Sequence, residues 1–334
     1  MSTARWAHIS LVLLIAAMAL PLFPLSGEVE AASELPPPSA VALPQYGNVT
    51  ISLYVINVYD FQYKTGSYTF DFYLELQWTD SNITYLDWYL MNGMPSYPGA
   101  KNLVFIDNTS AVRSELWRVR ADLSVPIMAN EYPFDTVDLP ISIELLTPYF
   151  NTSLQWDRAQ SGVDPAFKIV GWDIIATTYV SGFHVYTLKY DEPQAVMTIT
   201  LVRSPMVGFI NTILPPLIFC IVSAFSFFLR LDESGSFSLR IGMNTSMIIT
   251  AVLFNISENG QIPPVTDLSF YSLYFVAVLC FLAGNLLVTM VEYIYWKRGM
   301  SQPRMRNINF WGALACLVLP AILIAVAILS LSPV

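Results

Sequence analysis

The residues at 239–257 have the length of a membrane span but are more polar than the other apolar segments of the chain. About 19 helical residues at about 1.5 Å each make roughly 28 Å of helix, close to the thickness of a bilayer core. The polar residues of this stretch are Asn244, Thr245, Ser246, Thr250 and Asn255. Polar side chains inside a membrane usually face other helices or water, so this segment can do more than anchor the chain.

The spacing of these residues places small and apolar side chains on one helical face. Steps of three and four residues join Gly242, Ser246, Ile249, Leu253 and Ile256. Several copies around an axis would form a narrow, wettable mouth followed by apolar rings, which can block ions by excluding water. Small polar residues also simply join neighbouring helices, and the segment alone favours that second interpretation.

The chain offers few residues for metal or nucleophilic chemistry. It has two histidines and three cysteines, and the cysteines, Cys220, Cys280 and Cys316, are scattered through apolar segments. His8 falls in a segment that we expect to be removed, which leaves His184. A zinc site, a catalytic triad and an extracellular disulfide are therefore not expected, nor is a cofactor or an enzymatic activity.

The composition indicates a membrane protein. Of the 334 residues, 54% are hydrophobic and only 12% are charged, and the mean hydropathy is +0.51. The formal net charge of -9 argues against a nucleic-acid partner.

The first 32 residues resemble a secretory signal peptide. Arg5 precedes an apolar run at 9–22, and small residues follow near 29–31. An uncleaved anchor is the alternative, but the run is short and ends at Pro21 and Pro24. The proline-rich residues that follow are typical of a stiff, extended linker.

Short alternating runs separated by turn residues fill the region between 49 and 202. Many strands within about 150 residues predict an all-β, immunoglobulin-like sandwich of about ten strands, which we assign to residues 33–203.

The last third, residues 204–334, predicts four membrane helices at about 206–229, 239–257, 268–295 and 310–331. Pro215 and Pro216 in the first helix require neighbours that satisfy freed carbonyls, which indicates a packed bundle. The link between the third and fourth helices is basic and is expected in the cytoplasm of a multi-pass cell-membrane protein, with the sandwich and the C-terminus outside. Its basic residues are Lys297, Arg298, Arg304 and Arg306.

Several short motifs occur in a fixed order along this architecture. They are Trp78-Thr79-Asp80, Tyr132-Pro133-Phe134-Asp135, Gly171-Trp172-Asp173-Ile174, Arg203 with Pro215, Phe254-Asn255-Ile256 with Ile262-Pro263, and the run at 274–278. In order and spacing they resemble a prokaryotic pentameric ligand-gated ion channel, of the superfamily that includes the Cys-loop receptors. The resemblance covers nearly everything after the signal peptide and implies a homopentameric ring of subunits in a lipid bilayer.

Two departures from the family pattern are visible. Val125 and Leu139 stand where the eukaryotic members have the two cysteines of a disulfide. Packing, and not a covalent bond, must therefore hold the loop between them. The aromatic-proline signature of the first binding loop is missing around 98–108.

The resemblance implies an extracellular ligand site between adjacent sandwiches, lined by aromatic residues that suit cationic amines. By position these are Tyr73, Tyr149, Phe150, Phe183, His184, Tyr186 and Tyr190. Ordinary core or surface aromatics are the alternative. His184 could also sense pH, so protons are a second class of ligand.

The resemblance also implies pore and coupling residues. Ser238 and Leu239 extend the pore face inward from Gly242. Asp135, Arg203 and Pro263 would couple the sandwich to the pore, because a buried Asp–Arg pair that lost one partner would leave a buried charge costing about 3–5 kcal/mol. A purely structural ion pair is the alternative.

Two features of the sequence predict opposite charges for the permeant ion. Leu239 stands where a bacterial relative has glutamate, and Arg240-Ile241-Gly242 resembles an anion-channel pattern. Asp232 and Glu233 nearby, and the acidic outer domain, would concentrate cations. We expect a cation channel; an anion channel of the same family and a non-conducting, membrane-anchored ligand-binding protein are the alternatives.

Overall fold

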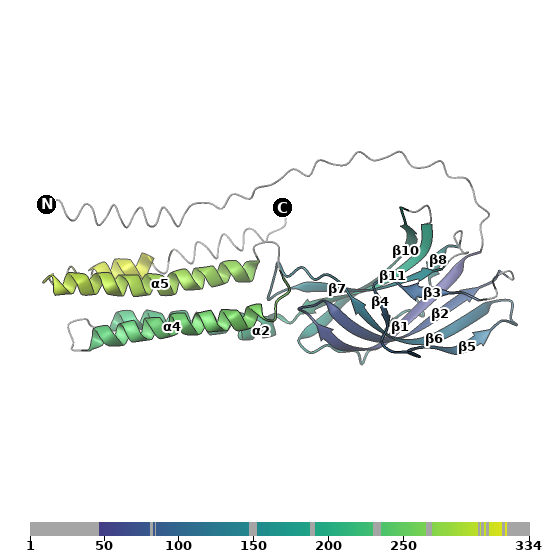
Figure 1. Ribbon diagram of the computed structural model, residues 1–334, viewed down its shortest axis with the longest axis horizontal. Helices are drawn as coiled ribbons and strands as arrows, with labels where there is room; N and C mark the ends of the chain where they lie inside the picture. Colours follow the sequence, from purple (N-terminus) through teal and green to yellow (C-terminus); the bar gives the residue numbers. More distant parts are fainter. Residues whose placement is uncertain are drawn as a thin grey trace. The chain divides into compact units, whose positions relative to one another are not determined.

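The computed structural model describes residues 47–318 apart from 81–82, 84, 147–151, 188–190, 230–234, 265–268, 300, 302–303, 305–306 and 316–317. The predicted signal peptide lies outside the described residues. A region of β-sheets comes first along the chain and helices follow it (Figure 1), as the sequence predicts.

The first sheet contains seven strands and its central strands are long. Its path runs β4 (Gly93–Pro95), β6 (Arg113–Ser124), β2 (Ser67–Trp78), β1 (Val49–Gln62) and β8 (Leu154–Trp156). Strand β5 (Lys101–Asp107) pairs with β6, and β9 (Gly162–Val163) pairs with β1.

The second sheet contains four strands. Their order is β10 (Trp172–Val185), β11 (Asp191–Arg203), β7 (Thr136–Leu145) and β3 (Trp88–Leu90). All neighbouring pairs in this sheet are antiparallel, and β10 and β11 form a long hairpin.

One apolar core lies between the two sheets. Alternate residues of β2, β7 and β11 point into it, because successive side chains of a strand lie on opposite faces. Phe70 and Leu74 of the first sheet and Ile141 and Ile199 of the second are fully buried in the same cluster. The alternating runs of the sequence therefore mark inward-facing positions of both sheets.

Among the described residues, three helical stretches are long and apolar enough to cross a membrane. The first, Pro205–Phe228, is made of α2 (Pro205–Gly208), the π-helical η1 (Phe209–Ile213), α3 (Leu214–Phe225) and the 3-10 turn η2 (Ser226–Phe228). The others are α4 (Ser236–Asn259), the least apolar of the three, and α5 (Phe270–Lys297). The fourth predicted helix, at about 310–331, falls largely outside the described residues; those at 307–315 are helical.

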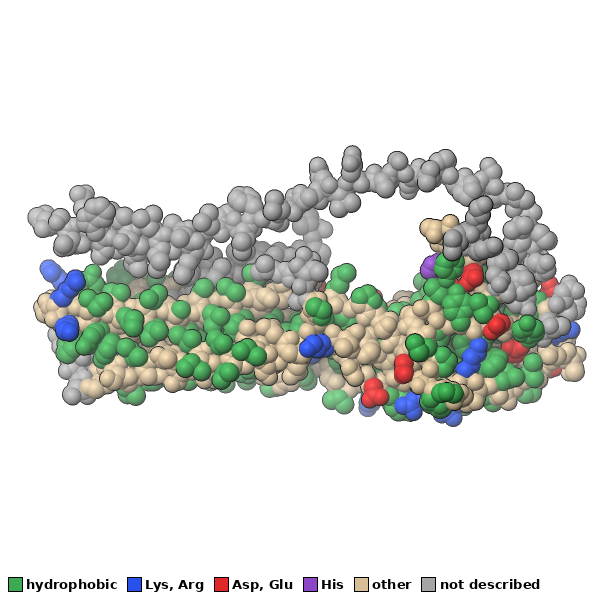
Figure 2. Space-filling view, viewed as in Figure 1, with side chains coloured by type: hydrophobic (Ala, Val, Ile, Leu, Met, Phe, Trp, Pro, Cys, Tyr) green, Lys and Arg blue, Asp and Glu red, His purple; other side chains and the backbone are tan. Residues whose placement is uncertain are grey.

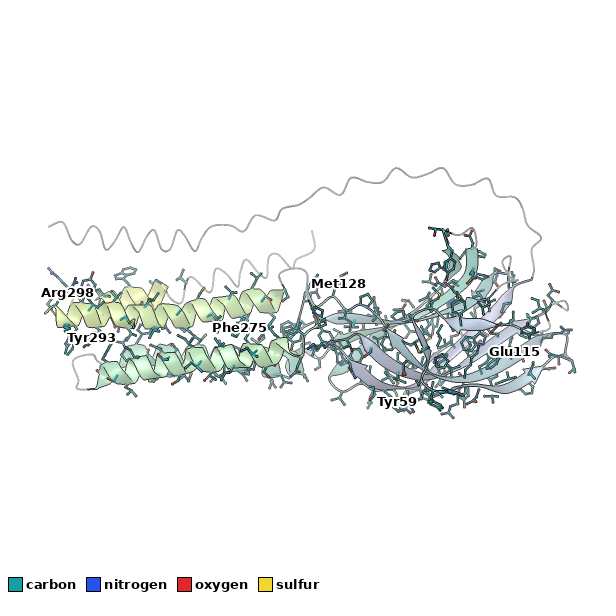
Figure 3. The ribbon with its side chains drawn as sticks, in the orientation of Figure 1. Tyr59, Glu115, Met128, Phe275, Tyr293 and Arg298 are labelled. Carbon is teal, nitrogen blue, oxygen red and sulfur yellow. The ribbon has the colours of Figure 1, made fainter. Side chains whose placement is uncertain are left out.

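The helices pack as a bundle. The Tyr274 hydroxyl of α5 donates to the Ile213 carbonyl at 2.8 Å, next to the two prolines of α3. This hydrogen bond ties α5 to the first helical stretch. Phe275 is buried between α4 and α5 (Figure 3). On the visible face, hydrophobic side chains cover the helices and Asp and Glu side chains gather over the sheets (Figure 2).

Candidate functional site

Helix α4 leaves the predicted pore face exposed in the single chain. The exposed fraction is 55% at Ile249, 62% at Leu253 and 63% at Ile256. The other members of the set are exposed as well: Ser238, Leu239, Gly242 and Ser246. Since α4 is helical from Ser236 to Asn259, these residues form one continuous face.

The opposite face of α4 packs into the chain's own bundle. Arg240, Asn244 and Ala251 are buried there. The Ser223 hydroxyl of α3 donates to Asn244 Oδ1 at 2.7 Å, and the Asn244 amide lies 3.4 Å from Thr289 Oγ1 of α5. Joining neighbouring helices is thus the role of Asn244, whereas Ser246 lies on the exposed face.

Arg240 is held inside the bundle by a carboxylate of α5. Its Nη1 donates to Glu292 Oε2 at 2.8 Å, and both side chains are only 1% exposed. A second guanidinium nitrogen donates to Asn309 Oδ1 at 3.2 Å. The charge of Arg240 is therefore paired inside the bundle, away from the exposed face of α4.

Two predicted coupling residues meet at the end of the sandwich. Asp135 Oδ2 lies 3.5 Å from Arg203 Nε and accepts a hydrogen bond from the Tyr63 hydroxyl at 2.7 Å. The backbone N–H of Arg203 also donates to the Asp135 carbonyl at 3.0 Å. Burial raises the pKa of Asp135, while the Tyr63 hydrogen bond and the Arg203 charge oppose that rise.

Three aromatic rings surround the Arg203 guanidinium. Its central carbon lies 4.5 Å from the Tyr63 ring centroid, 5.0 Å from that of Tyr132 and 4.5 Å from that of Trp172. The negative faces of such rings attract a cation. Two separate sequence motifs, at Tyr132 and Trp172, thus converge on one arginine. Sequence reasoning identified the motifs but not this arrangement.

The loop that carries Tyr132 contacts two helices. The Tyr132 hydroxyl donates to Glu258 Oε2, near the end of α4, at 2.7 Å, and the Phe270 N–H at the start of α5 donates to the Asn130 carbonyl at 3.0 Å. Sequence reasoning missed Glu258. The one feature that could have pointed to it is that an acidic residue stands alone at the end of an apolar span.

Two further residues fit the same junction closely. A Cβ at Gly208 would lie 2.5 Å from the Pro133 carbonyl oxygen, so only glycine lets the first helix pass this loop. Pro263, the third predicted coupling residue, is buried and follows Ile262, which packs in the same cluster as Tyr132.

The predicted ligand residues are divided between the two sheets. Tyr73 lies on β2 in the first sheet and lines a cavity of about 270 Å³. Phe183 and His184 lie near the end of β10 in the second sheet, and Tyr186 directly follows it. The cavity is lined by Ser52, Tyr54, Tyr73, Glu75, Leu116 and Gln160.

The hairpin residues form part of a polar cluster. The rings of His184 and Tyr186 stack with centroids 4.4 Å apart, and Phe183 is exposed. Tyr149, Phe150 and Tyr190 lie outside the described residues. Tyr73 is therefore not brought together with the hairpin residues as one aromatic box within the described part of the chain.

Sequence reasoning missed the centre of this cluster. Glu144 of β7 is fully buried and accepts hydrogen bonds from Tyr89 of β3 and from Tyr186. Glu192 of β11 contacts the same Tyr89 hydroxyl. An acid inside the alternating run of β7 was a weak signal, because its position predicts only a solvent-facing side chain.

Comparison with known proteins adds no assignment: no protein-family model matches the chain, and no curated protein matches it significantly.

Proposed function

We propose that the chain is one subunit of a homopentameric ligand-gated ion channel in which α4 lines a central pore. One observation carries the proposal. The α4 face on which Gly242, Ser246 and the apolar residues Ile249, Leu253 and Ile256 follow one another is the face that its own bundle leaves exposed. Turned toward a common axis, it would form a wettable inner mouth and apolar rings that exclude water.

A membrane anchor that does not conduct is the competing function. An anchor has no need for Gly242 and Ser246 in line on an exposed face, since both would then meet lipid or an unrelated helix. Asn244, a polar residue that joins helices in this bundle, lies on the other side of α4.

The contacts at the junction support a route for gating in the proposed channel. A ligand bound between adjacent sandwiches would favour the conformation to which it binds more tightly, in which the β10–β11 hairpin closes. The Asp135–Arg203 pair and the Tyr132–Glu258 hydrogen bond would then carry the movement to α4. A tilt or turn of α4 would widen the rings at Ile249, Leu253 and Ile256.

Cations are the permeant ions that this geometry favours. The anion-channel pattern includes Arg240, whose charge is buried against Glu292 rather than placed on the exposed face. The acidic chain, with its formal charge of -9, would raise the local cation concentration. The sandwich and the C-terminus would be outside the cell.

Paired serine substitutions in α4 test the proposal. Ile249→Ser should lower the wetting barrier and give leaky or easily opened channels in planar bilayers. Ile248→Ser is the matched control, because this neighbour packs against the bundle. Silence of the wild type and of Ile249→Ser across ligands and pH, or equal currents from both variants, would contradict the pore assignment.

Selectivity has its own test. In a salt gradient, Leu239→Glu should shift the reversal potential toward the equilibrium potential of the cation. The reason is that a ring of carboxylates would stand at the inner mouth. Leu239→Gln, of nearly equal size and no charge, is the control. Equal reversal potentials for the two variants would remove Leu239 from the pore.

A further inference from the structure

An exposed apolar face of α5 ends in a basic residue. Leu287, Val291 and Ile294 are 48%, 39% and 48% exposed, and steps of four and three residues place them on one side of the helix, which we call the α5 stripe. A further step of four reaches Arg298. The Arg298 N–H donates to the Ile294 carbonyl at 3.2 Å, so Arg298 continues the helical register. The α5 stripe therefore has a cation at its end.

The α5 stripe has the length of one leaflet of a bilayer. Leu287 and Arg298 are 11 residues apart, and at about 1.5 Å for each residue they are separated by roughly 16 Å along the helix. The hydrocarbon core of a bilayer is about 30 Å thick, so the acyl chain of one lipid covers about half of that distance. An acyl chain that lies along the α5 stripe would therefore bring its phosphate to the level of Arg298.

Aromatic side chains gather where α4 begins and α5 ends, which we call the basic end of the bundle. The rings of Phe237 and Tyr293 stack with centroids 3.8 Å apart, and the Trp296 ring lies 5.9 Å from that of Tyr293. Figure 3 labels Tyr293 and Arg298 near this end of α5. Tryptophan and tyrosine concentrate at the level of lipid headgroups, so these rings indicate where the membrane surface lies.

The segment that carries Trp311 is attached to the same end. Asn309 Nδ2 donates to the Phe227 carbonyl at 3.1 Å, and Asn309 Oδ1 accepts from Arg240, near the start of α4. Trp311, two residues further along, is exposed, as is Trp296. Two exposed indoles thus stand at the basic end.

Three exposed cations at the basic end have no acidic partner among the described residues. Lys297, Arg298 and Arg304 form none of the salt bridges found there. Glu292, near the end of α5, is already paired with Arg240. On the visible face, Lys and Arg side chains stand out at this end of the helices (Figure 2).

The charge count of the two links at the basic end is positive. Residues 229–235 and 297–306 contain five basic and two acidic residues, an excess of three positive charges. Residues 260–269, the link at the other end of α4 and α5, contain one acidic residue and no base. The acids of the first link are too few to neutralise the bases, so the complementary partner of the basic end is an anion. Basic residues beside membrane helices attract anionic lipid headgroups.

We propose that the basic end binds an anionic phospholipid of the adjoining leaflet. Its phosphate lies among Lys297, Arg298 and Arg304, and one of its acyl chains follows the α5 stripe. An arginine fork can donate two parallel hydrogen bonds to a phosphate group. A lipid fits the cations and the stripe together. A soluble phosphate would leave the stripe uncovered, and an apolar protein surface would leave the cations unpaired.

Quenching of tryptophan fluorescence by brominated lipids tests the proposal. The purified full chain is placed in phosphatidylcholine vesicles that contain increasing shares of brominated phosphatidylglycerol or of brominated phosphatidylcholine. Trp296 and Trp311 are the tryptophans of residues 204–334, so bromine inside the bilayer reports on the basic end. Brominated phosphatidylglycerol should bind at least about fivefold more tightly, because one Lys or Arg near anionic lipid contributes about that factor. Equal quenching by the two lipids would overturn the proposal.

Removal of the charges tests which residues hold the lipid. The triple variant Lys297→Gln, Arg298→Gln and Arg304→Gln should lose the preference for phosphatidylglycerol while keeping the fold, since the three side chains are exposed. Arg158→Gln, at an exposed arginine of the sandwich, is the matched control and should keep the wild-type preference. A preference that persists in the triple variant would overturn the proposal.

Soluble glycerol phosphate distinguishes a lipid site from a phosphate site. Added in excess to vesicles with brominated phosphatidylglycerol, it should leave the quenching unchanged, because it has no acyl chain to cover the α5 stripe. Loss of the preference on its addition would mean that the cations bind phosphate alone, which would overturn the proposal. None of these measurements requires a current, so their outcome is separate from that of the channel proposal.

Discussion

Two buried carboxylates beside or within β7 have different partners. Asp135, just before the strand, faces the permanent positive charge of Arg203 inside a cage of aromatic rings. Glu144, near the other end of the strand, faces phenols, an amide and a histidine, and it shares Tyr89 with Glu192. The junction cluster around Asp135 is therefore paired by charge, and the hairpin cluster around Glu144 by hydrogen bonds.

The difference separates two kinds of connection. An arginine stays charged at all physiological pH values, so the cation of the junction cluster is permanent. The hairpin cluster has no permanent cation among its described contacts, and hydrogen bonds from two phenols and an amide hold its carboxylate. In the proposed channel, the junction cluster would transmit movement to α4.

The largest expected effect is at the junction. Arg203→Ala leaves Asp135 buried without a charge partner and should destabilise the folded chain by about 3–5 kcal/mol. Thermal denaturation followed by circular dichroism would show the loss, and gating or assembly should fail with it.

The double variant Arg203→Ala with Asp135→Asn sharpens this result. Removing the unpaired charge should restore most of the lost stability, because the cost is that of an uncompensated ion. No recovery in the double variant would mean that Arg203 acts through packing with the aromatic rings instead. Normal currents from Arg203→Ala would contradict its coupling role.

A smaller effect is expected in the hairpin cluster. Glu144→Gln keeps the size of the side chain but replaces hydrogen bonds to a charged group by neutral ones, with a loss of about 1.5–3 kcal/mol. Hydrogen exchange of the hairpin amides at 182–187 should become faster, because Glu144 accepts hydrogen bonds from Tyr186 and Gln194. Exchange equal to that of the wild type would show that Glu144 does not hold the hairpin.

The smallest effect is expected at the link to α4. Tyr132→Phe removes one hydrogen bond to Glu258 and should cost about 1.5 kcal/mol. Tyr97→Phe, at an exposed tyrosine of the sandwich, is the control and should leave the melting temperature nearly unchanged. Equal melting temperatures for both variants would mean that the Tyr132 hydroxyl does not hold α4.

Much of the fold could be predicted because it depends on local patterns. Alternation in the first region and long apolar runs afterwards predict sheets followed by helices, and the three described spans lie near their expected positions. The steps from Gly242 to Ile256 define one helical face from the sequence alone. The roles of Asn244 and Arg240 could not be predicted, because the same span carries polar residues on both of its sides.

The sequence by itself determined which residues share a strand face or a helix face, since the periods of 2 and 3.6 are local properties of the backbone. Only the tertiary structure decided which polar groups are covered. Glu144 should face solvent by its place in β7, yet a hairpin that begins about 30 residues later folds over it. Arg203 is likewise surrounded by Tyr63, Tyr132 and Trp172 from three distant segments. Such neighbours are set by packing, which no local pattern records.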